Sequence, residues 1–437
     1  MKKILYLFVL LLPFAACKKE TPDVATIDVD LKINYSNTDF QKTFPLKNIQ
    51  ITLRNLATNV VTKYVANGGT FQIAGLAPGS YDIDASVTIP RQEYATLAGE
   101  DPGTDITFNA SNKRVSLINT TSLEFNLIAG QTGSFVLKQI YYAGSDNKEG
   151  ALYRDQFIEI YNNTDQVLYA DSLYFGRLYG RQSTRTATTH IQANGQHDWS
   201  KSLNMTVGNA ANTDYVYGRD LFMVPGTGKD YPVQPGQSII IAQNALNHKI
   251  PFTGADGKEV TIKKPELTVD LSGANFEVYY GKLPSVNPLP SDIDNPSVPN
   301  VDIIDYEARD WILDSPGRDS YFIFKGQTRQ AVEALKSYYE PTLAAPSASA
   351  KTYRQIPSAW LMDAVEVQPN LPDSRIPKKL LPAFDSGYTF ATDGSYSSQS
   401  VIRKTATTVS GRRVLKDTNN STEDFTVIKA NPRGFAD

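Results

Sequence analysis

Short runs of alternating apolar and polar residues, separated by turn residues, constrain this chain more than any other feature. The alternation is clearest at Ile27, Val29, Leu31 and Ile33, and it recurs over residues 49–53 and 81–87. Because successive side chains of a strand point to opposite faces, each run predicts a strand with one buried face. The chain is therefore predicted to be all-β. Further short strands are expected near residues 60–65, 70–73, 104–108, 115–118 and 122–128.

The composition agrees with this fold class and narrows the function. There are 24 Tyr and 19 Phe but only 4 Met, a bias that favours strands over helical bundles. The single cysteine excludes a disulfide framework within the chain, so the core must stabilise the fold. A length of 437 residues allows two or three domains. The formal net charge of −3, without a basic stripe, predicts no nucleic-acid partner.

The N-terminus has the layout of a bacterial secretory signal. Lys2 and Lys3 precede an apolar run at residues 4–12, and a polar segment begins after residue 17. The run is shorter than the roughly 20 residues that a membrane-spanning helix needs. Ala15-Ala16-Cys17 resembles a lipobox, the cleavage site of bacterial lipoproteins. The alternative is an ordinary cleaved signal with an incidental cysteine.

The lipobox resemblance implies a signal peptide at residues 1–16, a lipid on Cys17 and a polar tether over residues 17–24. The lipid would attach the protein to a membrane without any spanning segment. We therefore expect an outer-membrane lipoprotein of the cell envelope, on either the surface or the periplasmic face.

The first β-module is predicted over residues 25–129. Its segment NGGTFQIAGLAPGSYDIDA, residues 67–85, resembles the carboxypeptidase-regulatory or transthyretin-like domains of secreted proteins. In the turn of this segment, we expect Leu76 to close one end of the core, Gly79 to take a positive φ and Tyr81 to point inward. The resemblance implies a β-sandwich and no activity.

The second module is predicted over residues 133–437. Glu159-Ile160-Tyr161-Asn162, followed by a polar turn, resembles the lamin-tail domain, which is an immunoglobulin-like sandwich. Two stretches, near 177–231 and 281–358, exceed what a minimal sandwich needs, and we expect them to form long loop insertions. The second insertion opens with a polar linker and carries one short helix near residues 328–339. Rigid sandwiches often bind partners through such loops.

The whole chain is also similar to a family of Bacteroidota surface lipoproteins of unknown function. In that family a regulatory-type sandwich precedes a lamin-tail-like domain that has a YNN turn and a late DTNNSxxDF segment; the matching residues here are 161–163 and 417–425. The resemblance implies this architecture and location, and it implies no active site.

Polar residues that could carry chemistry have simpler explanations. Glu159 is expected to accept structural hydrogen bonds at a strand end, since a buried carboxylate needs partners. The three histidines, at 190, 197 and 248, lack the spacing of zinc ligands and are expected to be solvated. The acidic run from Asp292 to Glu307 is expected to be a solvated linker; calcium binding is the alternative. Motifs for nucleophilic catalysis or nucleotide binding are absent from the sequence. No catalytic residue, metal or cofactor is predicted.

Aromatic residues in the insertions are the remaining candidates for a binding surface. We single out Trp199, Tyr217, Trp311 and Tyr338, which could stack on sugars or form contacts with a protein; the alternative is that they cover the sandwich as additional core. The preferred function is non-catalytic binding through loops of the second module, with an outer-membrane transporter as the possible partner. A glycan-binding surface module and a hydrolase with paired carboxylates on the insertions are the alternatives.

Overall fold

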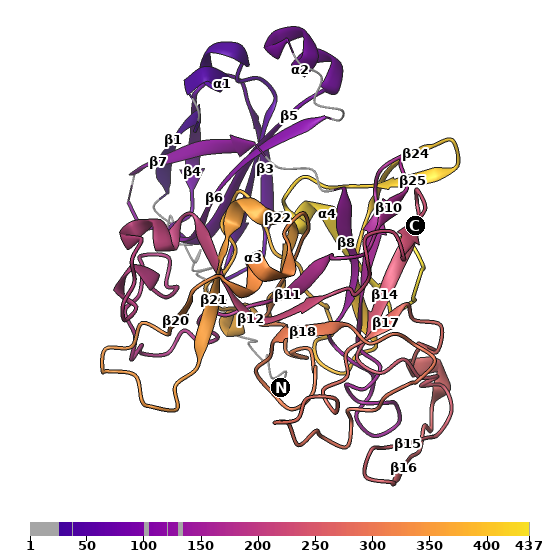
Figure 1. The fold of residues 1–437 in the computed structure, drawn as a ribbon. Helices are drawn as coiled ribbons and strands as arrows, with labels where there is room; N and C mark the ends of the chain where they lie inside the picture. Colours follow the sequence, from indigo (N-terminus) through magenta and orange to yellow (C-terminus); the bar gives the residue numbers. More distant parts are fainter. Residues whose placement is uncertain (1–25, 37, 100–104, 120, 130–133, 437) are drawn as a thin grey trace, which may run out of the picture.

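The computed structural model describes residues 26–36, 38–99, 105–119, 121–129 and 134–436. β-strands dominate these residues (Figure 1). They form two sandwiches of two layers each, one within residues 27–129 and the other within residues 135–429. The predicted all-β sandwich fold is confirmed. Cys17, the signal peptide and residues 18–24 of the tether lie outside the described residues.

The first sandwich consists of a seven-stranded sheet folded into two layers. β1 pairs with β4 and β7 in one layer, and β2 pairs with β3 and β5 in the other. Every second residue of β1 is buried, as the sequence alternation predicts. The strands, in the order β3-β2-β5-β6-β7-β1-β4, are β1 (Ile27–Tyr35), β2 (Ile49–Asn55), β3 (Val61–Ala66), β4 (Thr70–Leu76), β5 (Gly79–Ile89), β6 (Ile106–Leu117) and β7 (Thr121–Ala129).

Two short helices close one end of this core, and the sequence pattern did not predict them. They are α1 (Thr38–Thr43) and α2 (Arg91–Ala98). Phe44, just after α1, stacks on Tyr94 of α2 with ring centroids 4.8 Å apart. Tyr35 packs edge to face against Phe108 at the same distance. Aromatic rings thus fill the end of the sandwich that its strands leave open.

Two details of this module differ from the sequence prediction. Gly75, and not Gly79, has the positive φ, 69°. Tyr81 does point inward, is buried, and donates its hydroxyl to the carbonyl oxygen of Ala77 at 2.7 Å. The two strands predicted near 104–108 and 115–118 are one long strand, β6, because the polar residues between them continue to pair with β5.

The second sandwich is built from two facing sheets. One has the order β17-β14-β9-β8-β23-β26, and the other has the order β20-β21-β12-β11-β19-β22, with β18 also paired to β12. The strands of the first sheet are β8 (Phe135–Tyr141), β9 (Phe157–Asn162), β14 (Ser238–Ala242), β17 (Phe276–Glu277), β23 (Gln399–Arg403) and β26 (Phe425–Lys429). Those of the second are β11 (Tyr174–Leu178), β12 (Tyr215–Met223), β18 (Asp302–Asp305), β19 (Ser320–Phe324), β20 (Ser337–Tyr339), β21 (Thr352–Pro357) and β22 (Leu361–Glu366).

Smaller elements decorate this sandwich. Three two-stranded ribbons pair β10 (Leu168–Tyr169) with β13 (Pro232–Val233), β15 (Phe252–Thr253) with β16 (Glu259–Val260), and β24 (Thr405–Val409) with β25 (Arg412–Leu415). Short 3-10 turns occur at Trp199–Lys201, Gly208–Asn212, Pro265–Leu267, Ser358–Trp360 and Pro372–Ser374. No helix among the described residues is both long and apolar enough to cross a membrane.

The two long stretches that were expected to be loops are part of the second sandwich. Residues 177–231 contribute β12, and residues 281–358 contribute β18, β19, β20 and β21. Nearly every residue of β12 is buried, because apolar clusters cover both faces of its sheet. A strand buried on both faces has no polar-apolar alternation, which is why the sequence pattern did not show it.

The predicted helix near residues 328–339 is shorter than expected. α3 spans Arg329–Glu333, and the Thr328 hydroxyl caps it by accepting from the Ala331 amide at 3.2 Å. Tyr338 and Tyr339 belong to strand β20 instead, because they pair with β21. A further helical turn, α4 (Ser421–Asp424), lies in the DTNNSTEDF segment.

Glu159 has the structural role that was predicted. Its side chain is fully buried and accepts from Lys138 Nζ at 2.8 Å and from Gln139 Nε2 at 3.2 Å. The hydroxyl of Ser238 and the amide of Arg433 complete the set. One of these four donors is a backbone amide, and the buried Lys138 supplies the positive charge that balances the carboxylate.

A candidate ligand cavity between the two sandwiches

The four aromatic rings predicted to contact a ligand are buried. Trp199 and Tyr217 stack with centroids 3.5 Å apart, and Tyr338 belongs to the same apolar cluster. Trp311 lies in the main core between the sheets. Their exposed fractions are only 1–6%. Burial makes these rings core residues in this structure, and it removes the surface on which a sugar or protein partner would stack.

Two of the three histidines are buried, so the expectation of solvated loop histidines is wrong for them. His197 is 3% exposed, and burial, helped by Arg181 and Lys379, lowers its pKa to about 4. His248 is fully buried, and burial lowers its pKa to about 3. His190 is half-buried. Within the described ranges, no group of three His, Cys, Asp or Glu side chains is placed to hold a metal ion.

The acidic run from Asp292 to Glu307 is not a solvated linker. Asp292 is 2% exposed, and burial raises its pKa to about 6. Three further carboxylates of the run form ion pairs with arginines, which give them a counter-charge from the protein itself. These pairs are Asp302–Arg329, Asp305–Arg354 and Glu307–Arg219.

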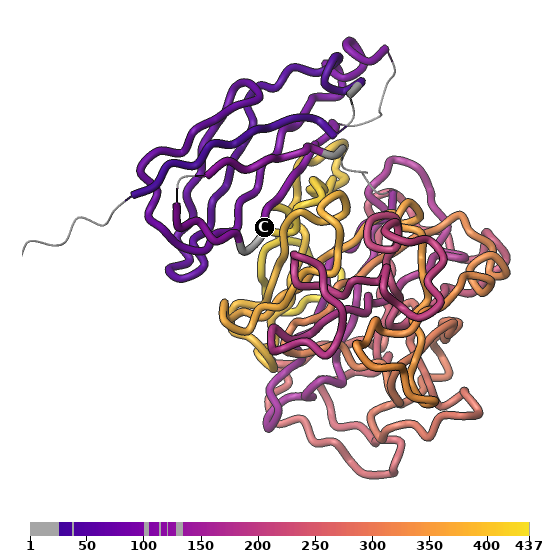
Figure 2. The backbone as a smooth tube through the Cα atoms, turned by 90° about the vertical axis from the view of Figure 1, so that its left-hand side faces the viewer, coloured from indigo at the N-terminus to yellow at the C-terminus, as the bar shows by residue number. Residues whose placement is uncertain are grey.

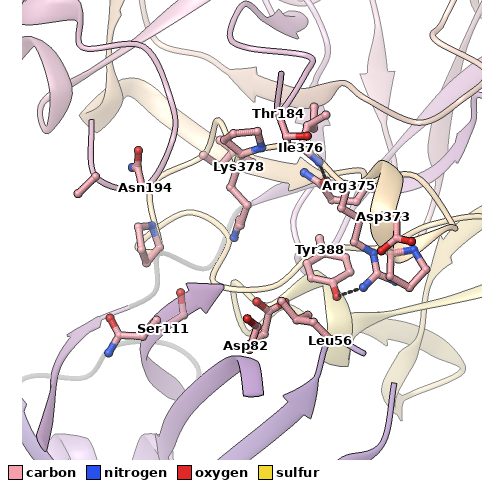
Figure 3. Close-up of a pocket in the computed structure, with 18 residues that line it drawn as sticks. Leu56, Asp82, Ser111, Thr184, Asn194, Asp373, Arg375, Ile376, Lys378 and Tyr388 are labelled. Atoms are coloured by element: carbon pink, nitrogen blue, oxygen red, sulfur yellow. Dashed lines mark hydrogen bonds between the residues drawn. The ribbon is translucent and has the colours of Figure 1, made fainter. Parts of the chain in front are cut away.

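A cavity of about 700 Å³ lies where the two sandwiches meet (Figure 3). We call it the junction cavity. Three parts of the chain line it: the first sandwich, a loop within residues 184–194, and the segment 368–388 of the second sandwich. The lining residues are Leu56, Ser80, Asp82, Ser111, Asn112, Thr184, Ala193, Asn194, Gln368, Pro372, Asp373, Arg375, Ile376, Pro377, Lys378, Leu380, Pro382 and Tyr388.

The floor of the cavity is the outer face of the first sandwich. Ser80 and Asp82 of β5 lie there beside Ser111 and Asn112 of β6. The inward neighbours of Asp82 along β5, Tyr81 and Ile83, are buried in the core. The alternation that builds the core therefore also places polar side chains on the face that meets the second sandwich.

The roof is an irregular segment whose backbone is held by buried side chains. The amide of Ile376 donates to Gln368 Oε1 at 2.9 Å. The amides of Lys379 and Leu380 donate to the buried carboxylate of Glu366 at 3.1–3.3 Å. Satisfied backbone groups allow an irregular segment to remain buried and ordered.

The loop that forms the wall is tied to this roof. Gln196 Nε2 donates to the carbonyl oxygen of Pro377 at 2.7 Å. Gly195 has φ 87°, and a Cβ at this position would lie 3.1 Å from Pro377 Cγ. The absence of a side chain at Gly195 thus lets the loop approach the roof closely.

Arg375 is the cationic side chain whose orientation is best defined in the cavity. Its Nη1 donates to the Tyr388 hydroxyl at 2.8 Å, and its guanidinium lies over the rings of Tyr388 and Phe390, at 4.9 and 5.1 Å from the centroids. Only 5% of Arg375 is exposed. A guanidinium fixed in this way presents its donors in one direction.

Polar contacts join the sandwiches around the cavity. Asn109 Nδ2 donates to the carbonyl oxygen of Thr418 at 2.5 Å, and Lys63 pairs with Glu423 at 3.3 Å. Arg54 lies over the ring of Tyr388, 5.9 Å from its centroid. Figure 2 shows the late segments of the chain beside the first sandwich. Side chains of both modules therefore hold the floor of the cavity against the segment that forms its roof.

Sequence reasoning missed the junction cavity because its residues are far apart in the chain. Asp82 and Arg375 are separated by almost 300 positions. One signal was available in the sequence. The strands of the first module carry polar residues on the face that points away from the core, and Asp82 is one of them. The two carboxylates of the cavity, Asp82 and Asp373, lie outside both predicted insertions, where paired carboxylates of a hydrolase were considered.

Comparison with known proteins places the chain near a family of unknown function. The family model "Protein of unknown function (DUF4876)" matches residues 234–432. No curated protein matches the chain. A DUF4876 family protein from Bacteroides thetaiotaomicron is 23% identical, with a TM-score of 0.51 over 94% of this chain and 98% of its own.

Two further solved structures, both from Bacteroides ovatus and each described as a "putative adhesin", are 8% identical to this chain. One has a TM-score of 0.16 over 37% of this chain and 57% of its own, and the other 0.18 over 50% and 84%. The predicted similarity to a Bacteroidota family of unknown function is confirmed at this level. The chain shares its fold with a DUF4876 protein over nearly its whole length, and its C-terminal half is similar in sequence to that family.

Proposed function

We propose that this protein is a non-catalytic binding protein of the bacterial cell envelope, anchored by a lipid on Cys17, and that its ligand occupies the junction cavity. The cavity carries the proposal. Its volume of about 700 Å³ is in the range of ligand pockets, which often form where two domains meet. Its charged side chains come from both sandwiches, so a bound ligand would contact both.

The arrangement of the lining supports selective binding. The roof is held by Gln368 and Glu366, and the wall is tied to it by Gln196. Arg375 is fixed by Tyr388. A site whose groups are already oriented loses little conformational entropy when a ligand binds, which favours affinity and specificity.

The anchor rests on the sequence around Cys17. β1 begins at Ile27, ten residues after this cysteine. A fully extended segment of that length spans about 35 Å. The first sandwich would then be the module that follows the anchor directly. An outer-membrane transporter is the protein partner that this location favours. Co-purification from detergent-solubilised envelope tests it, and recovery of no transporter would remove that partner from the proposal.

Blocking the cavity tests the binding function. Ala193 is an exposed lining residue, so Ala193→Trp should fill the cavity without disturbing a core. Ala255→Trp, at an exposed turn outside the cavity, is the matched control. The full-length lipoprotein, purified in detergent, is screened against an oligosaccharide array and a peptide array. We expect a ligand that binds the parent and the control equally and binds Ala193→Trp at least tenfold more weakly. Failure of every probe to bind, or equal binding by all three proteins, would refute the proposal.

A further inference from the structure

We infer that the ligand of the junction cavity is an oligosaccharide. This inference rests on the proposed function and names its ligand class. It follows from the kinds of side chain that line the cavity, from the sides on which they lie, and from the main-chain groups that the cavity does not offer.

The neutral polar side chains of the lining match sugar hydroxyl groups. Ser80, Ser111 and Asn112 lie on the floor, and Thr184 and Asn194 lie on the wall. Hydroxyl and carboxamide groups each combine donor and acceptor atoms. A sugar hydroxyl also donates and accepts, so several such groups on two sides can satisfy a ring that carries a hydroxyl on most of its carbons.

Charged groups of both signs complete the polar part of the lining. In Figure 3, Lys378 extends from the roof and Asp82 lies on the opposite side, on the floor. Arg375 and Asp373 add a second group of each sign on the roof. A ligand with one strong charge would meet a like charge in this cavity, at a cost in free energy. A neutral, hydroxyl-rich ligand meets no such penalty.

Apolar side chains lie between these polar groups. Leu56 belongs to the floor side, and Ile376, Pro377 and Pro382 belong to the roof. Sugar rings have C–H faces that bury well against such surfaces, while their hydroxyl edges need polar partners. The mixture of apolar and hydrogen-bonding groups in the lining therefore fits a sugar ring on both counts.

The cavity offers few main-chain groups for an extended peptide. β5, on the floor, is paired on one side with β2 and on the other with β6. On the roof, the amides of Ile376 and Leu380 and the carbonyl oxygen of Pro377 already have side-chain partners. Peptides that bind as added strands need an unpaired strand edge. Recognition in this cavity must come from side chains.

Affinity measurements on the array hits test the ligand class. Asn194→Ala removes a carboxamide from the wall, and Asn209→Ala removes an exposed carboxamide outside the cavity as a control. We expect a saturable oligosaccharide ligand whose affinity falls at least tenfold in Asn194→Ala and is unchanged in Asn209→Ala. Calorimetry on the detergent-purified full-length lipoprotein measures both values.

The outcomes separate this inference from the proposed function. If only a peptide binds, and Ala193→Trp blocks it, the junction cavity is a binding site and the oligosaccharide inference is wrong. Equal affinities of Asn194→Ala and the parent for the sugar would also contradict the inference. If no probe binds, or if Ala193→Trp binds as the parent does, both the inference and the proposed function fail.

Discussion

Replacing Glu366 by glutamine tests whether a buried carboxylate holds the roof of the junction cavity. Glu366 is fully buried at the end of β22. Its two oxygens accept from the Ser320 hydroxyl at 2.7 Å, from Gln368 Nε2 at 2.9 Å, and from the amides of Lys379 and Leu380 at 3.1–3.3 Å. Every neighbouring group donates. A glutamine of the same shape replaces one acceptor oxygen by an NH2 group that cannot accept.

The cost follows from the number of donors that lose their acceptor. The NH2 group of Glu366→Gln must face at least two of these donors, whichever way the amide is turned. A buried donor without an acceptor costs about 1–3 kcal/mol, so we expect the free energy of unfolding to fall by about 3 kcal/mol. For a module of about 300 residues, that loss corresponds to a decrease in Tm of about 5 °C.

Urea unfolding monitored by tryptophan fluorescence measures this effect. All three tryptophans, at 199, 311 and 360, lie in the second sandwich, so their fluorescence reports on the module that contains Glu366. Glu333→Gln is the control, because that exposed carboxylate forms only a surface ion pair with Arg329 and should change stability by less than about 0.5 kcal/mol. A stability of Glu366→Gln within about 0.5 kcal/mol of the parent would refute the argument that this carboxylate is a specific acceptor.

Three further predictions concern other parts of the chain. Burial lowers the pKa of His248 to about 3 in the folded protein, whereas the same side chain in the unfolded chain takes up a proton near pH 6.5. The folded protein therefore loses stability as the pH falls below 6.5. Replacing His248 by Phe should remove about 1 kcal/mol of the loss between pH 7.5 and 5.5, and an unchanged pH dependence in urea unfolding would contradict this. Arg403 is buried against Asp363 at 2.7 Å, so Arg403→Met should lower the free energy of unfolding by about 3–5 kcal/mol. The surface substitution Arg329→Met should lower it by less than about 1 kcal/mol. Similar losses of stability for the two variants in thermal unfolding would contradict the argument that the buried ion pair matters more. Cys17→Ser should abolish acylation and membrane retention, and mass spectrometry that finds no fatty acyl group on the parent protein would remove the anchor.

The strands that were predicted correctly from the sequence either bury one face only or end at a clear turn. β1 shows strict alternation, and its burial follows it residue by residue. β9 was expected from the lamin-tail-like residues 159–162 before a polar turn, and the strand ends at Asn162 as expected. Such patterns are local, because the side-chain direction of a strand depends only on its own backbone.

The candidate site was not predictable in the same way. The sequence identified Trp199 and Trp311 as aromatic residues of long stretches, but exposure depends on what other segments cover them. In the structure, Tyr217 covers Trp199, and both facing sheets enclose Trp311. β12 escaped prediction because it is buried on both faces and lacks alternation.

The amino-acid sequence by itself determined that this chain forms sheets, where most of its turns lie, and which side of the first-module strands is apolar, since these depend on backbone preferences and on the spacing of neighbouring residues. Only the tertiary structure decided which strands pair, which rings are covered, and that Asp82 and Arg375 line one cavity. Those outcomes depend on contacts between segments hundreds of residues apart, whose energies come from burying complementary surfaces and leave no periodic trace along the chain.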